Sequence, residues 1–150
     1  MRFLLDINVL IALFDEGHDH HELVGHWFVK HTDKGWSSCP ITQNGCIRIL
    51  SSPAYPRSRP VWDVLHTTSQ AFAHPRHSFI PDDVSICDAK FAENTLITSS
   101  QLTDIYLLQL ACSHMASFVT LDRRIPVGRL SWAKPDALVV LVEPNSSPKL

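Results

Sequence analysis

The sequence predicts an α/β fold, in which helices cover both faces of a parallel sheet. Short apolar segments of strand length alternate along the chain with segments whose apolar residues recur at helical spacing. This alternation is typical of parallel sheets, because the chain crosses from one strand to the next through a helix. The length of 150 residues suits one domain with a buried core.

The expected strands are short and apolar. The first is "FLL" near the N-terminus, and Pro40 and Pro81 end the second and the third. The expected strands cover residues 3–5, 35–39, 78–80, 117–121 and 137–142. The sheet is therefore expected to have four to five strands.

Helices are expected between these strands, where apolar residues recur every three to four positions. They cover residues 7–14, 19–32, 42–50, 61–72, 83–94 and 103–114. Asp19, Thr42 and Thr103 are expected to be N-caps, because their side-chain oxygens can accept hydrogen bonds from the first N–H groups of a helix. Residues 51–60 contain three prolines and three serines and are expected to form a loop.

The composition is that of a globular protein, and its charge excludes one class of nucleic-acid binder. Hydrophobic residues make up 45% of the chain, charged residues 19%, and the formal net charge is −2. A protein with this net charge does not bind nucleic acid through overall charge alone. Two stretches without acidic residues are nevertheless basic: they hold Lys34, Arg48, Arg57 and Arg59, and Arg123, Arg124, Arg129 and Lys134. Local guidance of a phosphate backbone and ordinary solvation explain these residues equally well.

Cysteine usage and hydropathy predict a soluble, cytoplasmic protein without a membrane partner. The four cysteines lie far apart and form no C-x-x-C pair, which favours reduced thiols over a zinc ribbon or a disulfide framework. No segment approaches the roughly 18 apolar residues of a membrane helix. Asp6 also interrupts the N-terminal apolar run where the core of a signal peptide would lie.

Three aspartates share a position in the predicted fold. Asp6 and Asp122 each follow a strand, so both are expected at the carboxyl edge of the sheet, where such sheets bind ligands. Asp104 lies in the first turn of a strongly apolar helix, where the helix dipole favours a negative charge. Carboxylates gathered from separate elements repel one another unless a cation lies between them, and hard oxygen ligands suit Mg²⁺ or Mn²⁺. Taken singly, Asp6 and Asp122 are explained equally well as helix caps, and Asp104 is explained better as a favourable helix-start charge than as a ligand.

Four blocks of sequence occur in the order "LLDINVLIALF", "CPITQNGCIRIL", "LTDIYLLQLA" and "VTLDRR". Together they resemble the PIN-domain ribonucleases, and more narrowly the VapC-type toxins of toxin–antitoxin pairs, over residues 1–142. The resemblance implies a three-layer α/β/α sandwich with a central parallel sheet, followed by a C-terminal tail at 143–150. It also implies Mg²⁺- or Mn²⁺-dependent hydrolysis of RNA phosphodiester bonds, a cognate antitoxin that blocks the site, and a two-fold homodimer.

The same resemblance assigns the candidate metal ligands. Asp6, Asp104 and Asp122 match the metal-binding acids of the family. Asn8 and Thr120 match polar positions that line the same pocket. The three acids are therefore the expected catalytic metal ligands, and the two polar residues are expected to contact the substrate.

Further residues are expected to contact water or RNA. Gln43 and Thr120 are assigned to orient substrate or water, and Arg123 or Arg124 to hold a flanking phosphate. Three arginines are weaker candidates for RNA contacts further from the site: Arg48, Arg57 and Arg59.

Gln43 departs from the family pattern, which has a glutamate at the start of this helix. An amide keeps an acceptor oxygen but lacks the negative charge, so affinity for a metal ion is expected to fall. Three acids still suffice for one ion together with water and phosphate. Asp82 or Asp83 is a less favoured candidate to supply the missing charge.

The sequence also allows two other interpretations. The cluster "HDHH" at 18–21 with His26 lacks the spacing of a zinc site, so these histidines are expected at the surface or at an interface. The second reading is a non-catalytic RNA- or protein-binding module whose metal site has degenerated at Gln43. Cleavage of RNA by the purified protein separates that module from a nuclease.

Overall fold

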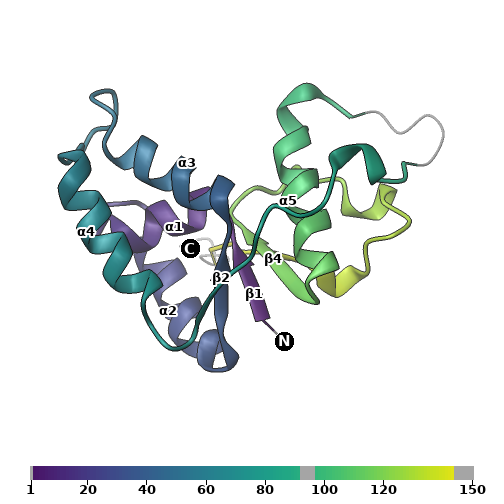
Figure 1. Cartoon of the computed structure of the whole chain (residues 1–150), viewed down its shortest axis with the longest axis horizontal. Coiled ribbons are helices and arrows are strands. Elements are labelled where there is room, and N and C mark those ends of the chain that lie inside the picture. The colour runs from purple at the N-terminus through teal and green to yellow at the C-terminus, as the bar shows by residue number, and fades with distance from the viewer. Residues whose placement is uncertain (1, 92–96, 144–150) are drawn as a thin grey trace, which may run out of the picture.

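A computed structural model describes residues 2–91 and 97–143 and contains, within these ranges, a five-stranded parallel sheet (Figure 1). The strand order is β3-β2-β1-β4-β5, and each neighbouring pair is parallel. The strands are β1 (Arg2–Leu5), β2 (Trp36–Ser38), β3 (His77–Phe79), β4 (Ala116–Thr120) and β5 (Leu138–Val140). The predicted parallel α/β sheet is confirmed.

The order of the strands reverses at the centre of the sheet. From β1 the chain first builds outward through β2 and β3, and it then returns to place β4 and β5 on the other side of β1. Leu5 at the end of β1 pairs with Val119 near the end of β4. The residues that follow each of them, Asp6 and Thr120, are therefore neighbours at the point where such sheets bind ligands.

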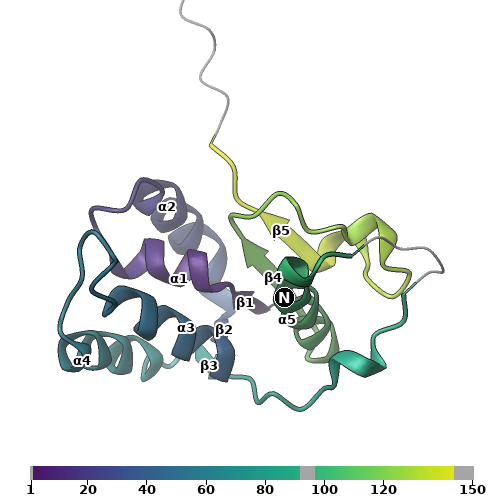
Figure 2. The same cartoon turned by 90° about the horizontal axis from the view of Figure 1, so that it is seen from above.

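Helices cover both faces of the sheet, as the three-layer expectation requires. Four lie together on one face: α1 (Ile7–Phe14), α2 (His21–His31), α3 (Pro40–Leu50) and α4 (Val61–Phe72). The fifth, α5 (Leu102–Ser113), covers the other face, as the two perpendicular views show (Figures 1 and 2). The predicted α/β/α sandwich is confirmed.

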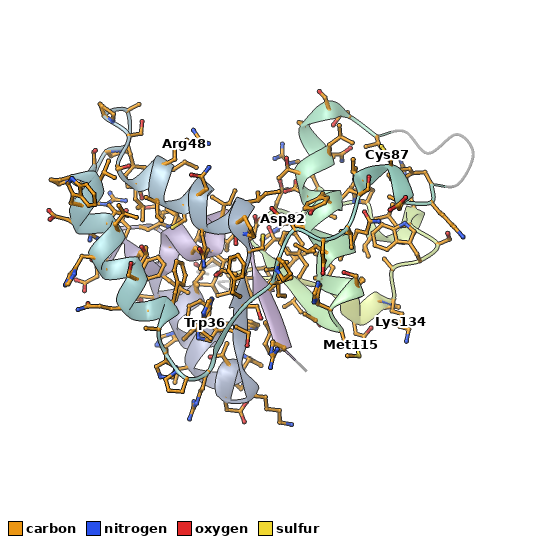
Figure 3. The ribbon with its side chains drawn as sticks, viewed as in Figure 1. Trp36, Arg48, Asp82, Cys87, Met115 and Lys134 are labelled. Carbon is orange, nitrogen blue, oxygen red and sulfur yellow. The ribbon has the colours of Figure 1, made fainter. Side chains whose placement is uncertain are left out.

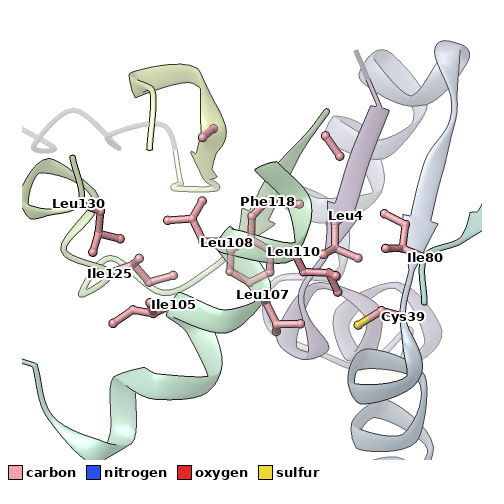
Figure 4. Close-up of a cluster of buried hydrophobic side chains, with 13 residues drawn as sticks. Leu4, Cys39, Ile80, Ile105, Leu107, Leu108, Leu110, Phe118, Ile125 and Leu130 are labelled. Carbon is pink, nitrogen blue, oxygen red and sulfur yellow. The ribbon is translucent and has the colours of Figure 1, made fainter. Parts of the chain in front are cut away.

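The sheet separates two hydrophobic cores, because successive strand residues point to opposite faces. Leu4 and Phe118 pack in the core beneath α5, which Figure 4 shows in close-up. Their chain neighbours Leu5 and Val119 pack in the core formed with α1 to α4. All four of these side chains are fully buried. At these positions the central strands are therefore buried on both faces.

Three predicted N-caps are wrong. The observed caps are His20 for α2, Cys39 for α3 and Gln101 for α5, in place of the predicted Asp19, Thr42 and Thr103. α3 begins earlier than predicted because Pro40, whose backbone angle suits a first helical position, starts it directly after β2. The Thr42 hydroxyl instead accepts a hydrogen bond from the Cys39 N–H at 2.9 Å, as part of a capping box.

The helix predicted for residues 83–94 is wrong over its described part. Only a single 3₁₀ turn forms there, at Ile86–Asp88. The Ser85 hydroxyl caps that turn by accepting a hydrogen bond from the Cys87 N–H at 3.2 Å, which favours a turn over a helix. The rest of this prediction, residues 92–94, lies outside the described residues, as do residues 144–150 of the predicted tail.

All four cysteines are free thiols, in accordance with the sequence-based expectation. Across residues 2–91 and 97–143, none of the helices combines the length and the apolar character that crossing a membrane requires.

A buried carboxylate fixes the loop at residues 51–60 to the end of α1. Asp15 is only 8% exposed, and the Nε atom of Arg57 lies 2.8 Å from each of its oxygens. The Tyr55 hydroxyl and the Gly17 N–H donate to the same carboxylate. The hydrogen bonds from Arg57, above all, hold the pKa of Asp15 well below its ordinary range. Arg57, a weak candidate for RNA contact, is thus engaged by Asp15.

Asp15→Asn is expected to lower the free energy of unfolding by about 1–2 kcal/mol at neutral pH, because the neutral amide loses charge-assisted hydrogen bonds. Urea denaturation measures this change. The folded protein lowers the pKa of Asp15, so the stabilisation is present above about pH 4 and is lost as the pH falls further. The difference between wild type and variant should therefore shrink in acid.

The exposed Asp33 provides the control, as Asp33→Asn. Equal destabilisation by both variants, or a difference that persists undiminished in acid, would contradict the role of the Asp15 carboxylate.

Candidate active site

Asp6 lies where β1 passes into α1, and protein donors bind both of its oxygens. Its side chain is only 4% exposed. Oδ1 accepts a hydrogen bond from the Ile7 N–H at 2.7 Å and so caps α1, while Oδ2 accepts one from the Thr120 hydroxyl at 2.6 Å. The Asp6 N–H donates to the Val119 carbonyl at 2.9 Å. The carboxylate is therefore held jointly by α1 and β4.

Asn8 and Thr120 tie the end of β4 to the first turn of α1. The Asn8 amide donates from Nδ2 to Thr120 Oγ1 at 3.2 Å, and its Oδ1 accepts from the Leu121 N–H at 3.1 Å. The buried Thr120 hydroxyl also accepts from the Asp122 N–H at 3.0 Å. The polar atoms of both side chains thus already have protein partners, and they position Asp6 and Asp122.

The three predicted acids interact electrostatically. The pKa of Asp6 is raised to about 6, chiefly by burial and additionally by the charges of Asp104 and Asp122, against the hydrogen bond from Thr120. Burial and the charge of Asp122 likewise raise the pKa of Asp104 in the first turn of α5. The negative charges of Asp104 and Asp122 thus oppose ionisation of Asp6, and a cation bound among these carboxylates would relieve this repulsion.

These acids do not form a ready-made metal cage. No three His, Cys, Asp or Glu side chains in the described parts of the chain are arranged to bind one metal ion. Asp122 instead pairs with Arg124: Nη2 lies 2.7 Å from Oδ2, and Nε lies 3.0 Å from Oδ1. The hydrogen bonds from Arg124 lower the pKa of Asp122. The donors are the hard oxygens that Mg²⁺ and Mn²⁺ prefer, and both oxygens of Asp122 already accept hydrogen bonds from Arg124.

Gln43 lies near the start of α3 and is bound by a residue of β2. Its Nε2 donates to the Ser38 hydroxyl at 2.9 Å, and that oxygen lies 2.7 Å from Nε2 of His77. Ser38 is fully buried. Sequence reasoning missed Ser38 and His77, since neither belongs to a motif and only the pairing of β2 with β3 brings them together.

A glycine allows α3 to lie directly against α1. A Cβ atom at Gly45 would stand 2.5 Å from Cδ1 of Ile7, so any larger residue would press on α1. Ile7 follows Asp6 in the chain. The helix that carries Gln43 is therefore packed against the residue next to the buried carboxylate.

Asp82 and Asp83 have partners elsewhere in the fold. Asp82 lies between α3 and α5 (Figure 3), where hydrogen bonds from the Cys39 thiol and the Tyr106 hydroxyl partly oppose the effect of burial, which raises its pKa. Asp83 accepts a hydrogen bond from His114 Nε2 at 2.9 Å, beyond the end of α5 opposite to Asp104. Asp83 is thus remote from the three acids, and Asp82 is bound to protein donors.

The candidate phosphate-binding arginines differ in their surroundings. Arg124 is paired with Asp122, whereas Arg123 and Arg48 are exposed at the surface. Arg59 donates to the Thr67 hydroxyl at 2.6 Å and thereby ties the loop to α4. The exposed arginines are the ones that can reach a ligand without breaking a contact in the fold.

Sequence comparison finds relatives that span almost the whole chain. The chain is 39% identical over 142 residues to Ribonuclease VapC44 of Mycobacterium tuberculosis. The aligned region covers 94% of this chain and 100% of that protein. It is 38% identical over 124 residues to Ribonuclease VapC29 of the same species, covering 81% of this chain and 86% of the relative. No family model matches the sequence.

Structure comparison supports the fold. The VapBC2 complex of Rickettsia felis, solved with a DNA fragment from its promoter, matches with a TM-score of 0.58 and 12% identity, over 95% of this chain and 100% of that chain. VapC20 of Mycobacterium tuberculosis, described as a toxin that cleaves the sarcin–ricin loop, matches with a TM-score of 0.56 and 6% identity, over 89% and 99% of the two chains.

Thr120→Val is expected to lower the free energy of unfolding by about 1–3 kcal/mol, because it leaves Asp6, Asn8 and the Asp122 N–H without their shared partner. Thr120→Ser keeps the hydroxyl and should restore most of the loss. Urea denaturation of both variants, with the exposed Thr103→Val as control, measures the effect. Equal stability of the valine and serine variants would show that the hydroxyl does not hold the site together.

Proposed function

The chain belongs to the VapC family of ribonucleases, and from this membership we propose that it is a metal-dependent endoribonuclease toxin that hydrolyses RNA phosphodiester bonds. The observation that carries the proposal is that Asp6 lies at the reversal point of the sheet and that the charges of Asp104 and Asp122 act on its carboxylate. The 39% sequence identity to VapC44, over the full length of that protein, supports the proposal. We assign the ribonuclease domain to residues 1–142 and a tail to 143–150.

Mg²⁺ or Mn²⁺ is the proposed cofactor, with Asp6, Asp104 and Asp122 as its ligands. Mutually repelling carboxylates with hard oxygen donors fit such an ion. When bound, the ion would supply an activated water and neutralise charge on the scissile phosphate. Residues of the chain hold the ligands: Thr120 and Ile7 orient Asp6, and the Asp122 N–H is fixed to Thr120.

Arg124 has a proposed role in exchanging partners. Its guanidinium neutralises Asp122 in the absence of a ligand, and the same group can form paired hydrogen bonds to a phosphate. A flanking phosphate of the RNA would then draw Arg124 away as Asp122 turns to the ion. Arg123, exposed beside it, would bind a neighbouring phosphate. Asn8 and Thr120, proposed from sequence to contact the substrate, would act through Asp6 and Asp122.

A cognate antitoxin and a second copy of this chain are the proposed protein partners, in the cytoplasm. A groove of about 410 Å³ lies between residues of α1, α2 and α4, and Phe14, Phe28 and Trp36 are among its apolar lining residues. Val29 at its border is 83% exposed. An apolar segment of an antitoxin would cover this surface.

The alternative is a non-catalytic RNA- or protein-binding module. It is favoured by Gln43, which lacks the charge that the family resemblance implies, and by the pairing of Asp122 with Arg124 rather than with the other acids. The two functions differ in whether the purified protein cleaves RNA.

Asp6→Asn and Asp104→Asn are each expected to abolish cleavage of total RNA in the presence of Mn²⁺, because each removes a proposed ligand charge. The protein must be freed of any antitoxin, and cleavage is followed by sequencing the new RNA ends. Asp83→Asn, which changes a carboxylate paired with His114, is the control and should remain active. The same products from all three variants would indicate a contaminating nuclease, and no cleavage by the wild type would favour the binding module.

Gln43→Glu is expected to tighten Mn²⁺ binding about tenfold in calorimetry, since a further negative charge near the acids is worth on the order of 1.4 kcal/mol. Gln70→Glu adds the same charge on the exposed surface of α4 and should change little. Unchanged affinity in the first variant would mean that position 43 does not face the ion.

A further inference from the structure

A relay of hydrogen bonds runs from the end of α4 to Gln43. The backbone of Phe72, the last residue of α4, hydrogen-bonds the His77 ring. Nε2 of that ring lies 2.7 Å from the Ser38 hydroxyl, and the hydroxyl accepts a hydrogen bond from Nε2 of Gln43 at 2.9 Å. Three elements, α4, β3 and β2, thus contribute to holding one amide of α3.

Aromatic neighbours hold the His77 ring in place. The ring of Trp36 lies 4.6 Å from it, measured between centroids, and the ring of Phe72 lies 5.1 Å away. Burial lowers the pKa of His77, while the bond to Phe72 opposes that change. The imidazole is therefore neutral near pH 7, with one donating and one accepting nitrogen.

The chemistry of the partners gives this relay one direction. The Phe72 backbone raises the pKa of His77, as a carbonyl that accepts from the ring does, and this favours a hydrogen on Nδ1 that leaves Nε2 to accept. Ser38 must then donate its single hydrogen to His77, and its oxygen is left to accept from the Gln43 amide. The NH₂ group of Gln43 is thereby turned toward the sheet, and its carbonyl oxygen Oε1 faces away from Ser38.

We propose that Ser38 and His77 are positioning residues, which hold the Gln43 amide in a single orientation and present its carbonyl oxygen to the carboxylate site. The effect of this positioning on RNA cleavage rests on the proposed nuclease function. The hydrogen bonds of the relay do not depend on that function. It gives the neutral side chain at position 43 a defined role as an oriented acceptor.

The relay also distinguishes glutamine from glutamate. A carboxylate at position 43 has no hydrogen to give, so it would face the lone pairs of Ser38 while the serine hydrogen is bound to His77. Protonation of His77 relieves the conflict, because its Nε2 then donates to Ser38 and frees the Ser38 hydrogen for the carboxylate. A glutamate would thus favour the protonated form of His77, two hydrogen bonds away.

Nitrogen NMR of the full-length protein tests the relay without any assay of activity. The chain has nine histidines, so His77→Gln identifies the His77 signals by their loss. The wild type is expected to show His77 as the Nδ1–H tautomer, and Gln43→Glu is expected to raise the pKa of His77 by at least about 1. An Nε2–H tautomer in the wild type, or the same His77 pKa in both proteins, would overturn the proposal.

Two adjacent buried serines allow a controlled test of whether the relay affects RNA cleavage. Ser38→Ala interrupts the relay and is expected to lower the rate of RNA cleavage about tenfold, as the loss of a supporting partner does. Ser37 is equally buried, and its hydroxyl has no hydrogen-bond partner within the described ranges, so Ser37→Ala should leave the rate unchanged. Equal rates in the two variants would refute the positioning role.

The relay and the nuclease function fail separately. A wild type that shows the expected tautomer but cleaves no RNA would refute the function and leave the relay standing. A wild type that cleaves RNA but carries the Nε2–H tautomer would refute the relay alone. The tautomer is read from the wild type, so this part of the test does not depend on whether Ser38→Ala folds.

Discussion

The buried carboxylate of Asp6 is the constraint on which the rest of the structure depends. An ionised group in apolar surroundings is stable only when its oxygens are hydrogen-bonded, and here the Ile7 N–H and the Thr120 hydroxyl supply those bonds. Because the two donors come from α1 and from β4, the same side chain joins the halves of the sheet at the point where strand order reverses. The fold thus holds this carboxylate at the edge where ligands reach parallel sheets.

Side chains of the protein are hydrogen-bonded to two of the three acids, Asp6 and Asp122. Asp122 is neutralised by Arg124, and Asp104 keeps a raised pKa because Asp122 and burial act on it together. Gln43, by contrast, is neutral, and its amide is hydrogen-bonded to Ser38. A neutral side chain adds no repulsion between like charges, and it adds no attraction for a cation either.

The sequence alone predicted the sheet, the course of α1 and α4, and the edge on which the acids lie, because strand and helix periodicity are local signals. The first residues of helices were harder to predict. Threonine is a favourable N-cap residue, but α3 begins at Pro40, two residues before Thr42. Asp122 and Arg124 are only two positions apart, and they form an ion pair. The sequence did not predict this pair, because the order of charged residues does not determine which partner a carboxylate binds. Ser38 and His77 are 39 positions apart, and only the neighbouring of β2 and β3 brings them into contact.

The contact at Gly45 carries a mechanical consequence. Because Ile7 fills the space that a side chain at Gly45 would need, α3 cannot slide along α1 without pushing on the residue between Asp6 and Asn8. A displacement of α3 along its own axis would therefore be transmitted to the backbone next to the Asp6 carboxylate.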